Sequence, residues 1–105
     1  MKEIHAFKAA LTRASHETSR LMSSHLRSEA HASGWPKEVT RRMKVTYGKD
    51  GFQAHVHDSH KAVADDLEYG TPSTRPTAAV RRFSNRTKEA DTFLAGRLNQ
   101  ILGDL

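Results

Sequence analysis

The first 33 residues contain neither glycine nor proline, and apolar residues recur among them at intervals of three, four and their multiples. This spacing places the apolar side chains on one face of an α-helix. We therefore expect a helix from about Lys2 to His31, about 28 residues and about 42 Å long. Serine and threonine crowd its centre, where a kink or break would be consistent with the sequence. The apolar positions are Ile4, Phe7, Leu11, Ala14, Leu21, Met22 and Leu26.

Apolar and polar residues then alternate in two short segments, from Val39 to Tyr47 and from Phe52 to Val56. Arg41 interrupts the first segment, which is consistent with a strand start or a bulge at this position. A period of two predicts β-strands with one covered face, and the intervening Gly48-Lys49-Asp50-Gly51 supplies a turn. We expect an antiparallel hairpin in which Tyr47 opposes Phe52. In this register the covered face holds Met43, Val45, Tyr47, Phe52, Ala54 and Val56, and the other face pairs Lys44 with His55 and Arg42 with His57.

The remaining chain predicts a short helix over residues 62–68, ended by Gly70, and then a loop over Thr71–Pro76. We expect Gly70 to turn the chain with a positive φ. A long C-terminal helix should follow from about Pro76 to Leu102, locally weakened at Ser84-Asn85. Its apolar positions are Val80, Phe83, Ala90, Leu94, Leu98, Ile101 and Leu105.

These elements predict one α+β domain over residues 1–105: long helix, hairpin, short helix, proline-bearing loop, long helix. A two-stranded sheet is marginal by itself, so we expect a larger sheet, or strands from a neighbouring copy. Hydrophobic residues make up only 36% of the chain. A neighbouring subunit is therefore expected to complete the burial of the helices.

The composition excludes several classes of protein. The chain has no cysteine, which excludes disulfides and thiolate sites. Its apolar runs are too short for a membrane span of about 20 residues, so no membrane partner is expected. The formal net charge of +5 is consistent with contacts to nucleic acid or to an acidic protein surface.

The segment from His55 to His60 is the strongest candidate for a metal site. It resembles the histidine-rich zinc motif of metallo-β-lactamase-like hydrolases, but Ser59 stands where that motif has its aspartate. The expected cross-strand neighbours of His55 and His57 are cationic and would repel a divalent ion. We therefore expect a polar strand face with no metal, and a histidine–metal hydrolase is the weakest reading.

Other catalytic arrangements are missing from the sequence. It contains no glycine-rich phosphate loop and no Gly-x-Ser-x-Gly elbow. The carboxylates of Asp65, Asp66 and Glu68 have no evident apolar pocket that would suit them to acid–base catalysis. We expect no catalytic residue, no cofactor and no enzymatic activity.

The charged residues form separate groups along the chain. An acidic group, Asp65, Asp66 and Glu68, precedes a basic group, Arg81, Arg82 and Arg86. Such groups are usually solvated, but they also fit a contact in which the acidic region of one copy meets the basic region of the next. We take these six residues as the candidate subunit interface.

The run Asp66-Leu67-Glu68-Tyr69-Gly70-Thr71, followed by Arg75-Pro76 and an amphipathic helix, resembles a known family. It is similar to the tail-completion or neck proteins of long-tailed phages, the gene-product-ten-like family named from a Hong Kong lambdoid phage. The order of elements extends the resemblance over nearly the whole chain. One departure is Ser73-Thr74, where family members often carry large apolar residues. The motif residues are Glu68, Tyr69, Gly70, Thr71, Arg75 and Pro76.

The resemblance implies a structural virion protein, made in the host cytoplasm, that forms a homo-oligomeric ring at the head–tail junction as a neck, tail-completion or tail-terminator component. It implies neighbouring head-connector and tail proteins as partners, with double-stranded DNA passing non-specifically through the ring. Arg42 and Lys44 are our candidate DNA-channel contacts. The alternative is a small basic nucleic-acid-binding protein that acts as a monomer or dimer, which charge alone favours.

Overall fold

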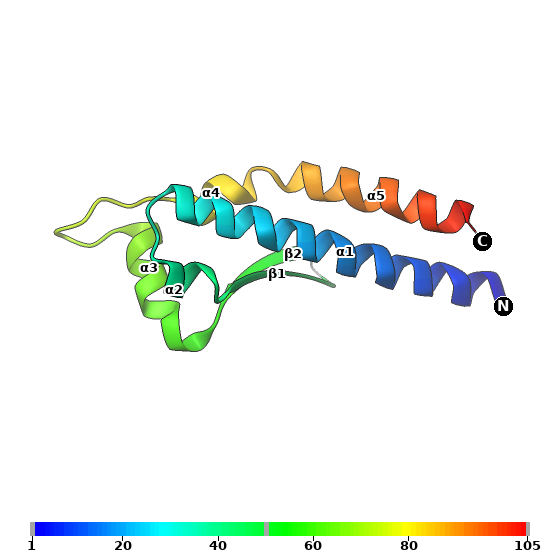
Figure 1. Cartoon of the computed structure of the whole chain (residues 1–105), viewed down its shortest axis with the longest axis horizontal. Helices are drawn as coiled ribbons and strands as arrows, with labels where there is room; N and C mark the ends of the chain where they lie inside the picture. The colour runs from blue at the N-terminus through cyan, green and yellow to red at the C-terminus, as the bar shows by residue number, and fades with distance from the viewer. Residues whose placement is uncertain (1, 50, 105) are drawn as a thin grey trace.

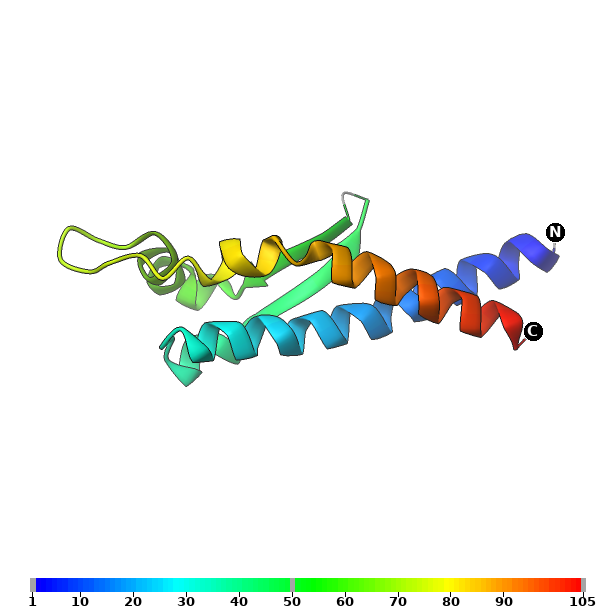
Figure 2. The ribbon, with the colours of Figure 1, turned by 90° about the horizontal axis from the view of Figure 1, so that it is seen from above.

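The computed structural model describes residues 2–49 and 51–104, so Asp50 of the expected turn and Leu105 of the expected apolar stripe lie outside the described residues. The mixed helix-and-strand architecture that we predicted is confirmed. The molecule is elongated, 58 × 23 × 21 Å, with α1 and α5 side by side along its length (Figures 1 and 2). The elements are α1 (Lys2–Ala32), α2 (Lys37–Thr40), β1 (Met43–Gly48), β2 (Gly51–Val56), the 3₁₀ turn η1 (Asp58–His60), α3 (Lys61–Tyr69), α4 (Ala79–Ser84) and α5 (Thr87–Gly103).

Helix α1 runs without a break through its serine- and threonine-rich centre. The Thr18 hydroxyl donates to the carbonyl of Ala14 at 2.7 Å, and the Ser23 hydroxyl donates to the carbonyl of Ser19 at 2.7 Å. These hydroxyls bond within the helix instead of competing with it, so they do not interrupt the backbone. The break that the sequence allowed at this centre is therefore not observed.

The core lies where α1 meets the hairpin and α4. The side chains of Met22 and Leu26 project from α1 into this core and are almost completely buried. Trp35, directly after α1, is also buried. The full cluster of buried residues is Met22, Leu26, Ala30, Trp35, Val39, Met43, Val45, Ala64, Ala79, Phe83 and Ala90.

The hairpin has the predicted register. Met43 pairs with Val56, Val45 with Ala54, Tyr47 with Phe52, and Gly48 with Gly51. The polar face also has the predicted pairing of Lys44 with His55, and the His57 N–H donates to the Arg42 carbonyl at 3.0 Å. The alternation of residue types was therefore sufficient to predict which residues oppose each other.

The predicted covering of the hairpin's apolar face is correct for only part of it. Met43 and Val45 are buried, and Phe52 and Val56 are partly buried, whereas Tyr47 and Ala54 are exposed. The buried residues lie under α1 and α4, while the Tyr47 ring packs mainly on Phe52, with centroids 4.8 Å apart. Within the described residues the sheet contains β1 and β2 only. A further strand from a neighbouring copy stays a prediction.

Side chains of α1 bond to the edge of β1 that β2 leaves free. The Ser23 hydroxyl accepts from the Val45 N–H at 2.8 Å and lies 3.3 Å from the Val45 carbonyl. The Arg27 Nε donates to the Met43 carbonyl at 2.9 Å. These bonds satisfy backbone groups that an unpaired strand edge would otherwise leave buried without partners.

Substitution Ser23→Ala should therefore lower the free energy of unfolding by about 1–2 kcal/mol, because it leaves the buried Val45 N–H without an acceptor. The neighbouring Ser24 is exposed, so Ser24→Ala should change stability by less than about 0.5 kcal/mol. Urea unfolding followed by circular dichroism measures both. Equal effects of the two substitutions would show that the bond to β1 contributes nothing.

The extension of the first strand back to Val39 was wrong. Residues 37–40 form the short helix α2, and the strand begins at Met43, two residues after the interruption at Arg41. The N–H groups of Val39 and Thr40 donate to the Pro36 carbonyl at 3.0 and 3.1 Å. This helical turn places Val39 in the core.

The long helix predicted from Pro76 to Leu102 was also wrong in its bounds. The backbone stays irregular until α4 begins at Ala79, and Asn85 and Arg86 separate α4 from α5. The N–H groups of Thr77 and Ala78 donate to the Leu67 and Glu68 carbonyls at the end of α3, at 2.9 and 3.1 Å. These contacts between distant segments replace the helical bonds that the local sequence favours. The break itself falls next to the predicted weak point at Ser84-Asn85.

The N-terminal part of α1 and the C-terminal part of α5 form a two-helix arm. This arm extends beyond the hairpin to the end of the molecule where α1 begins and α5 ends (Figure 1). Its small core holds Ala10, Ala14 and Ile101. Glu17 of α1 bonds Arg97 of α5 and lies 3.3 Å from Arg13. The hydrogen bond from Arg97, supported by Arg13, holds the pKa of Glu17 below its ordinary value, so this carboxylate stays ionised at neutral pH.

Candidate assembly site

The motif loop begins with a tight turn at Gly70. Gly70 has φ +79°, which confirms the predicted positive φ. A Cβ atom at this position would lie 2.7 Å from the Thr74 carbonyl oxygen and 2.8 Å from the Pro76 nitrogen. Only glycine allows the chain to pass this close to itself. The loop is closed by bonds of 2.9 and 3.2 Å between the backbones of Thr71 and Thr74, and it projects from the end of the molecule opposite the arm (Figure 1).

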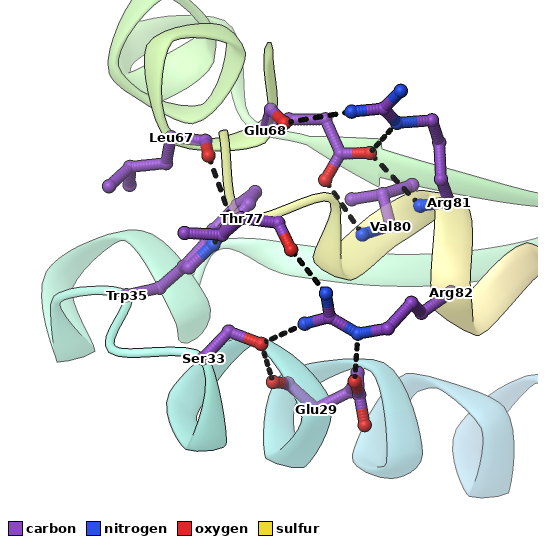
Figure 3. A network of polar contacts seen from close by, with 9 residues as sticks. All are labelled: Glu29, Ser33, Trp35, Leu67, Glu68, Thr77, Val80, Arg81 and Arg82. Carbon is purple, nitrogen blue, oxygen red and sulfur yellow. Dashed lines mark hydrogen bonds and ion pairs between the residues drawn. The ribbon is translucent and has the colours of Figure 1, made fainter. Parts of the chain in front are cut away.

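Glu68 lies on the inward side of this turn, although its charge suggested an exposed position. Only 4% of the residue is exposed. Its carboxylate accepts from the backbone N–H groups of Val80 and Arg81 at 2.8 and 2.9 Å, and the Arg81 Nε lies 3.4 Å away (Figure 3). The first N–H groups of a helix have no partner within it, so the carboxylate satisfies the start of α4. Glu68 thereby holds α3 and α4 together.

Trp35 and Thr77 connect the same region to the end of α1. The Trp35 indole N–H donates to the Thr77 hydroxyl at 2.7 Å, and that hydroxyl donates to the Leu67 carbonyl at 2.7 Å (Figure 3). Because Trp35 is buried, its N–H needs this partner. The bond fixes the return of the chain after the loop.

Four of the six charged residues of the candidate interface have partners within the chain. Arg82 donates to Glu29 at 2.9 Å and also bonds Ser33 and the Thr77 carbonyl, and Arg86 bonds both carboxylate oxygens of Glu89, at 3.1 and 3.0 Å. The contacts observed for Glu68, Arg81, Arg82 and Arg86 are therefore intramolecular. Asp65 and Asp66 are exposed on α3. Contacts across a subunit boundary stay a prediction for all six residues.

Exposed apolar side chains occur at both ends of the molecule. At the loop end, α3 exposes 46% of Val63 and 64% of Tyr69, and the Tyr69 ring lies 5.4 Å from the Arg81 guanidinium. We call Val63 and Tyr69 the loop-end surface. The arm exposes Ile4 and Phe7, which are 53% and 46% accessible. We call these two residues the arm surface. Phe93 is also exposed, but it lies one turn before Arg97, which bonds Glu17, and so away from this end.

The two candidate channel residues differ in their surroundings. The Arg42 guanidinium is engaged by the Glu38 carbonyl at 2.8 Å, and Arg42 is half-buried. Lys44 is exposed and lines a groove between α1 and β1. Of the two, Lys44 is the one that lines this groove.

The histidines of the candidate metal motif bond neighbouring hydroxyl groups. His55 bonds Thr46 at 2.8 Å, and Ser59 bonds both His57 and His60 at 2.7 Å. Among residues 2–49 and 51–104, no three metal-ligating side chains are grouped so that they could hold an ion. The expected absence of a metal remains a prediction. No helix described here combines the length and apolar character that crossing a membrane requires.

A row of serines on α1 lines a groove that we did not predict from the sequence. Ser15, Ser19 and Ser23 are four residues apart and line the groove beside β1. Their regular spacing was the available signal, but serine in a helix was read only as a weak helix former. Arg20 and Arg27 line the same groove.

Comparison of the chain with protein-family models, curated proteins and solved structures finds no match. The resemblance to phage tail-completion proteins therefore rests on the Glu68–Thr71 motif, on the Arg75-Pro76 pair and on the order of the elements. It enters below as a proposal.

Proposed function

We propose that this chain is a structural virion protein of a long-tailed phage, made in the host cytoplasm, which forms a ring around the DNA channel at the head–tail junction. The observation that carries the proposal is the presence of two different exposed apolar surfaces, one at each end of an elongated molecule. The sequence motif at the loop end supports the same assignment.

Two different surfaces favour a head-to-tail contact between copies. A contact in which the arm surface of one copy meets the loop-end surface of the next can repeat about an axis and close into a ring. Such a contact would bury Phe7 and Tyr69. Full burial of a side chain of the size of Phe contributes about 1.5–3 kcal/mol to the free energy of association. Asp65 and Asp66 lie beside the loop-end surface on α3 and are available to cations of the adjoining copy.

The projecting loop suits contacts with other components of the junction. Residues 72–76 are exposed and belong to no helix or strand, so they are available to the neighbouring head-connector and tail proteins. The Gly70 turn and the Glu68 carboxylate hold the base of the loop in one position. Because its base is already fixed, the loop loses less conformational entropy on binding a partner than a flexible loop would.

Electron cryo-microscopy of purified particles, or of a reconstituted neck, tests this function. The expected result is a symmetric ring of this chain at the head–tail junction. Substitutions Phe7→Ser and Tyr69→Ser should abolish the ring while each isolated protein keeps its fold, and Asn99→Ala, on the exposed face of α5, is the matched control that should assemble normally. If the chain is missing from particles and binds DNA as a lone monomer, the nucleic-acid-binding alternative replaces this proposal.

A further inference from the structure

A groove of about 820 Å³ lies between α1 and β1, apart from both apolar surfaces. Its helical wall includes Ser15, Ser19 and Arg20, and its strand wall includes Lys44 and Thr46.

The charges in the groove have one sign. Of the twelve described residues that line it, none carries a carboxylate, whereas Arg20, Arg27 and Lys44 are cations. Arg27 donates its Nε to the Met43 carbonyl, but the guanidinium has further N–H donors and the residue is exposed. Half of the lining residues carry a hydroxyl group: Thr12, Ser15, Ser19, Ser23, Thr46 and Tyr47. The Ser23 hydroxyl is already bonded to the backbones of Ser19 and Val45.

One of these hydroxyls is buried without a partner. Ser15 is 8% exposed, and its Oγ makes no hydrogen bond within the described residues. A buried polar group without a partner costs about 1–3 kcal/mol, so such groups are rare in folded proteins unless a ligand or water satisfies them. The Ser15 Oγ has almost no accessible surface, so a ligand in the groove contacts it only after the side chain rotates towards the groove.

We propose that this groove binds the sugar–phosphate backbone of DNA without reading its sequence. Cations with hydroxyl donors are the groups that contact phosphate oxygens in protein–DNA interfaces. The serines repeat every four residues, about 6 Å along the helix axis, so Ser15 to Ser23 span about 12 Å. A DNA strand, which carries one charge per about 3.4 Å, is a linear anion that can follow such a row.

A linear anion fits this groove better than the acidic surface of a second copy. The exposed carboxylates of α3, Asp65 and Asp66, are adjacent residues on a helix of nine residues, whereas the groove cations are spread over α1 and β1. The placement of this DNA inside a channel rests on the proposed function; the binding itself does not. Arg20 and Arg27 thereby join Lys44 in the role that we first gave to Arg42 and Lys44.

Titration of the ¹⁵N-labelled chain with a 12-base-pair DNA duplex, followed by ¹H–¹⁵N NMR at low salt, tests the proposal and detects binding as weak as millimolar. The amide signals of residues 15–23 and 44–46 should shift saturably. With three cations engaged, the slope of log K against log salt should be about −2.7. Arg20→Gln combined with Lys44→Gln should reduce that slope by about 2 and weaken binding at least tenfold.

Two further variants separate a binding role from a structural one. Lys37→Gln combined with Lys88→Gln removes the same charge from exposed positions outside the groove and should leave the groove shifts in place. Ser15→Ala should raise the urea midpoint of the free chain, because it removes a buried hydroxyl that has no internal partner, yet weaken DNA binding about threefold or more.

Three results would overturn the assignment: no shifts in the groove, equal losses in both charge-deletion pairs, or groove shifts that appear on raising protein concentration without DNA. The last result would give the groove to a second copy. A ring seen in particles together with a failed titration would reject the groove and leave the proposed function standing. The reverse combination would reject the ring and leave the groove.

Discussion

Replacement of Glu68 by alanine should lower the free energy of unfolding by about 3 kcal/mol. The substitution removes a buried carboxylate that accepts two backbone hydrogen bonds at the start of α4 and lies beside the Arg81 guanidinium. Hydrogen bonds to a charged group contribute about 1.5–3 kcal/mol each, and the loss leaves the N–H groups of Val80 and Arg81 without acceptors. Urea unfolding of the purified chain measures the change.

Two controls separate the role of this carboxylate from the effect of losing any charge on α3. Asp66→Ala removes an exposed carboxylate of the same helix and should change stability by less than about 0.5 kcal/mol. Glu68→Gln keeps the size and one acceptor oxygen, so its effect should be intermediate. If Glu68→Ala unfolds at the same urea concentration as the parent, α4 does not depend on this contact.

The second large effect is expected for Gly70→Val, which should destabilise the chain by about 3 kcal/mol or more. A β-branched residue at φ +79° is strained, and its Cβ would lie 2.7 Å from the Thr74 carbonyl oxygen. The backbone cannot relieve this contact without opening the loop, since the nearest atoms belong to the main chain of residues 74 and 76. Thermal unfolding and NMR signals of the loop should both report the change.

Gly96 provides the matched control. It lies in α5, and a Cβ added there meets nothing within 4 Å. Gly96→Ala should therefore stabilise the isolated chain by about 0.5–1 kcal/mol, because alanine favours a helix more than glycine does. A Gly70→Val protein as stable as its parent would mean that the turn is not required for folding.

The candidate site was only partly predictable. Gly70 could be identified from its place between a helical segment and a proline-bearing loop, because the backbone demand is local. Glu68 was assigned to a surface contact, because a carboxylate next to Asp65 and Asp66 reads as one exposed acidic group. Its true partners, Val80 and Arg81, are 12 and 13 residues away, and nothing in the spacing indicates that the loop returns them to the end of α3.

The sequence by itself determined the elements whose physics is local. Alternation with a period of two set the hairpin register from Met43–Val56 to Tyr47–Phe52, because a slip of one residue would exchange its two faces. The absence of helix breakers before Gly34 determined α1 in the same way. These features depend on residues close together in the chain.

The tertiary structure alone decided where groups without a local partner find one. It moved the start of the C-terminal helical segment from Pro76 to Ala79, because the N–H groups of Thr77 and Ala78 bond the carbonyls of α3. It placed Ser23 against the free edge of β1. It also left Tyr47 exposed, since burial depends on which elements reach the hairpin. The physical reason is that a buried donor or acceptor must be satisfied by whatever group packing brings near it, and periodicity carries no information about that group.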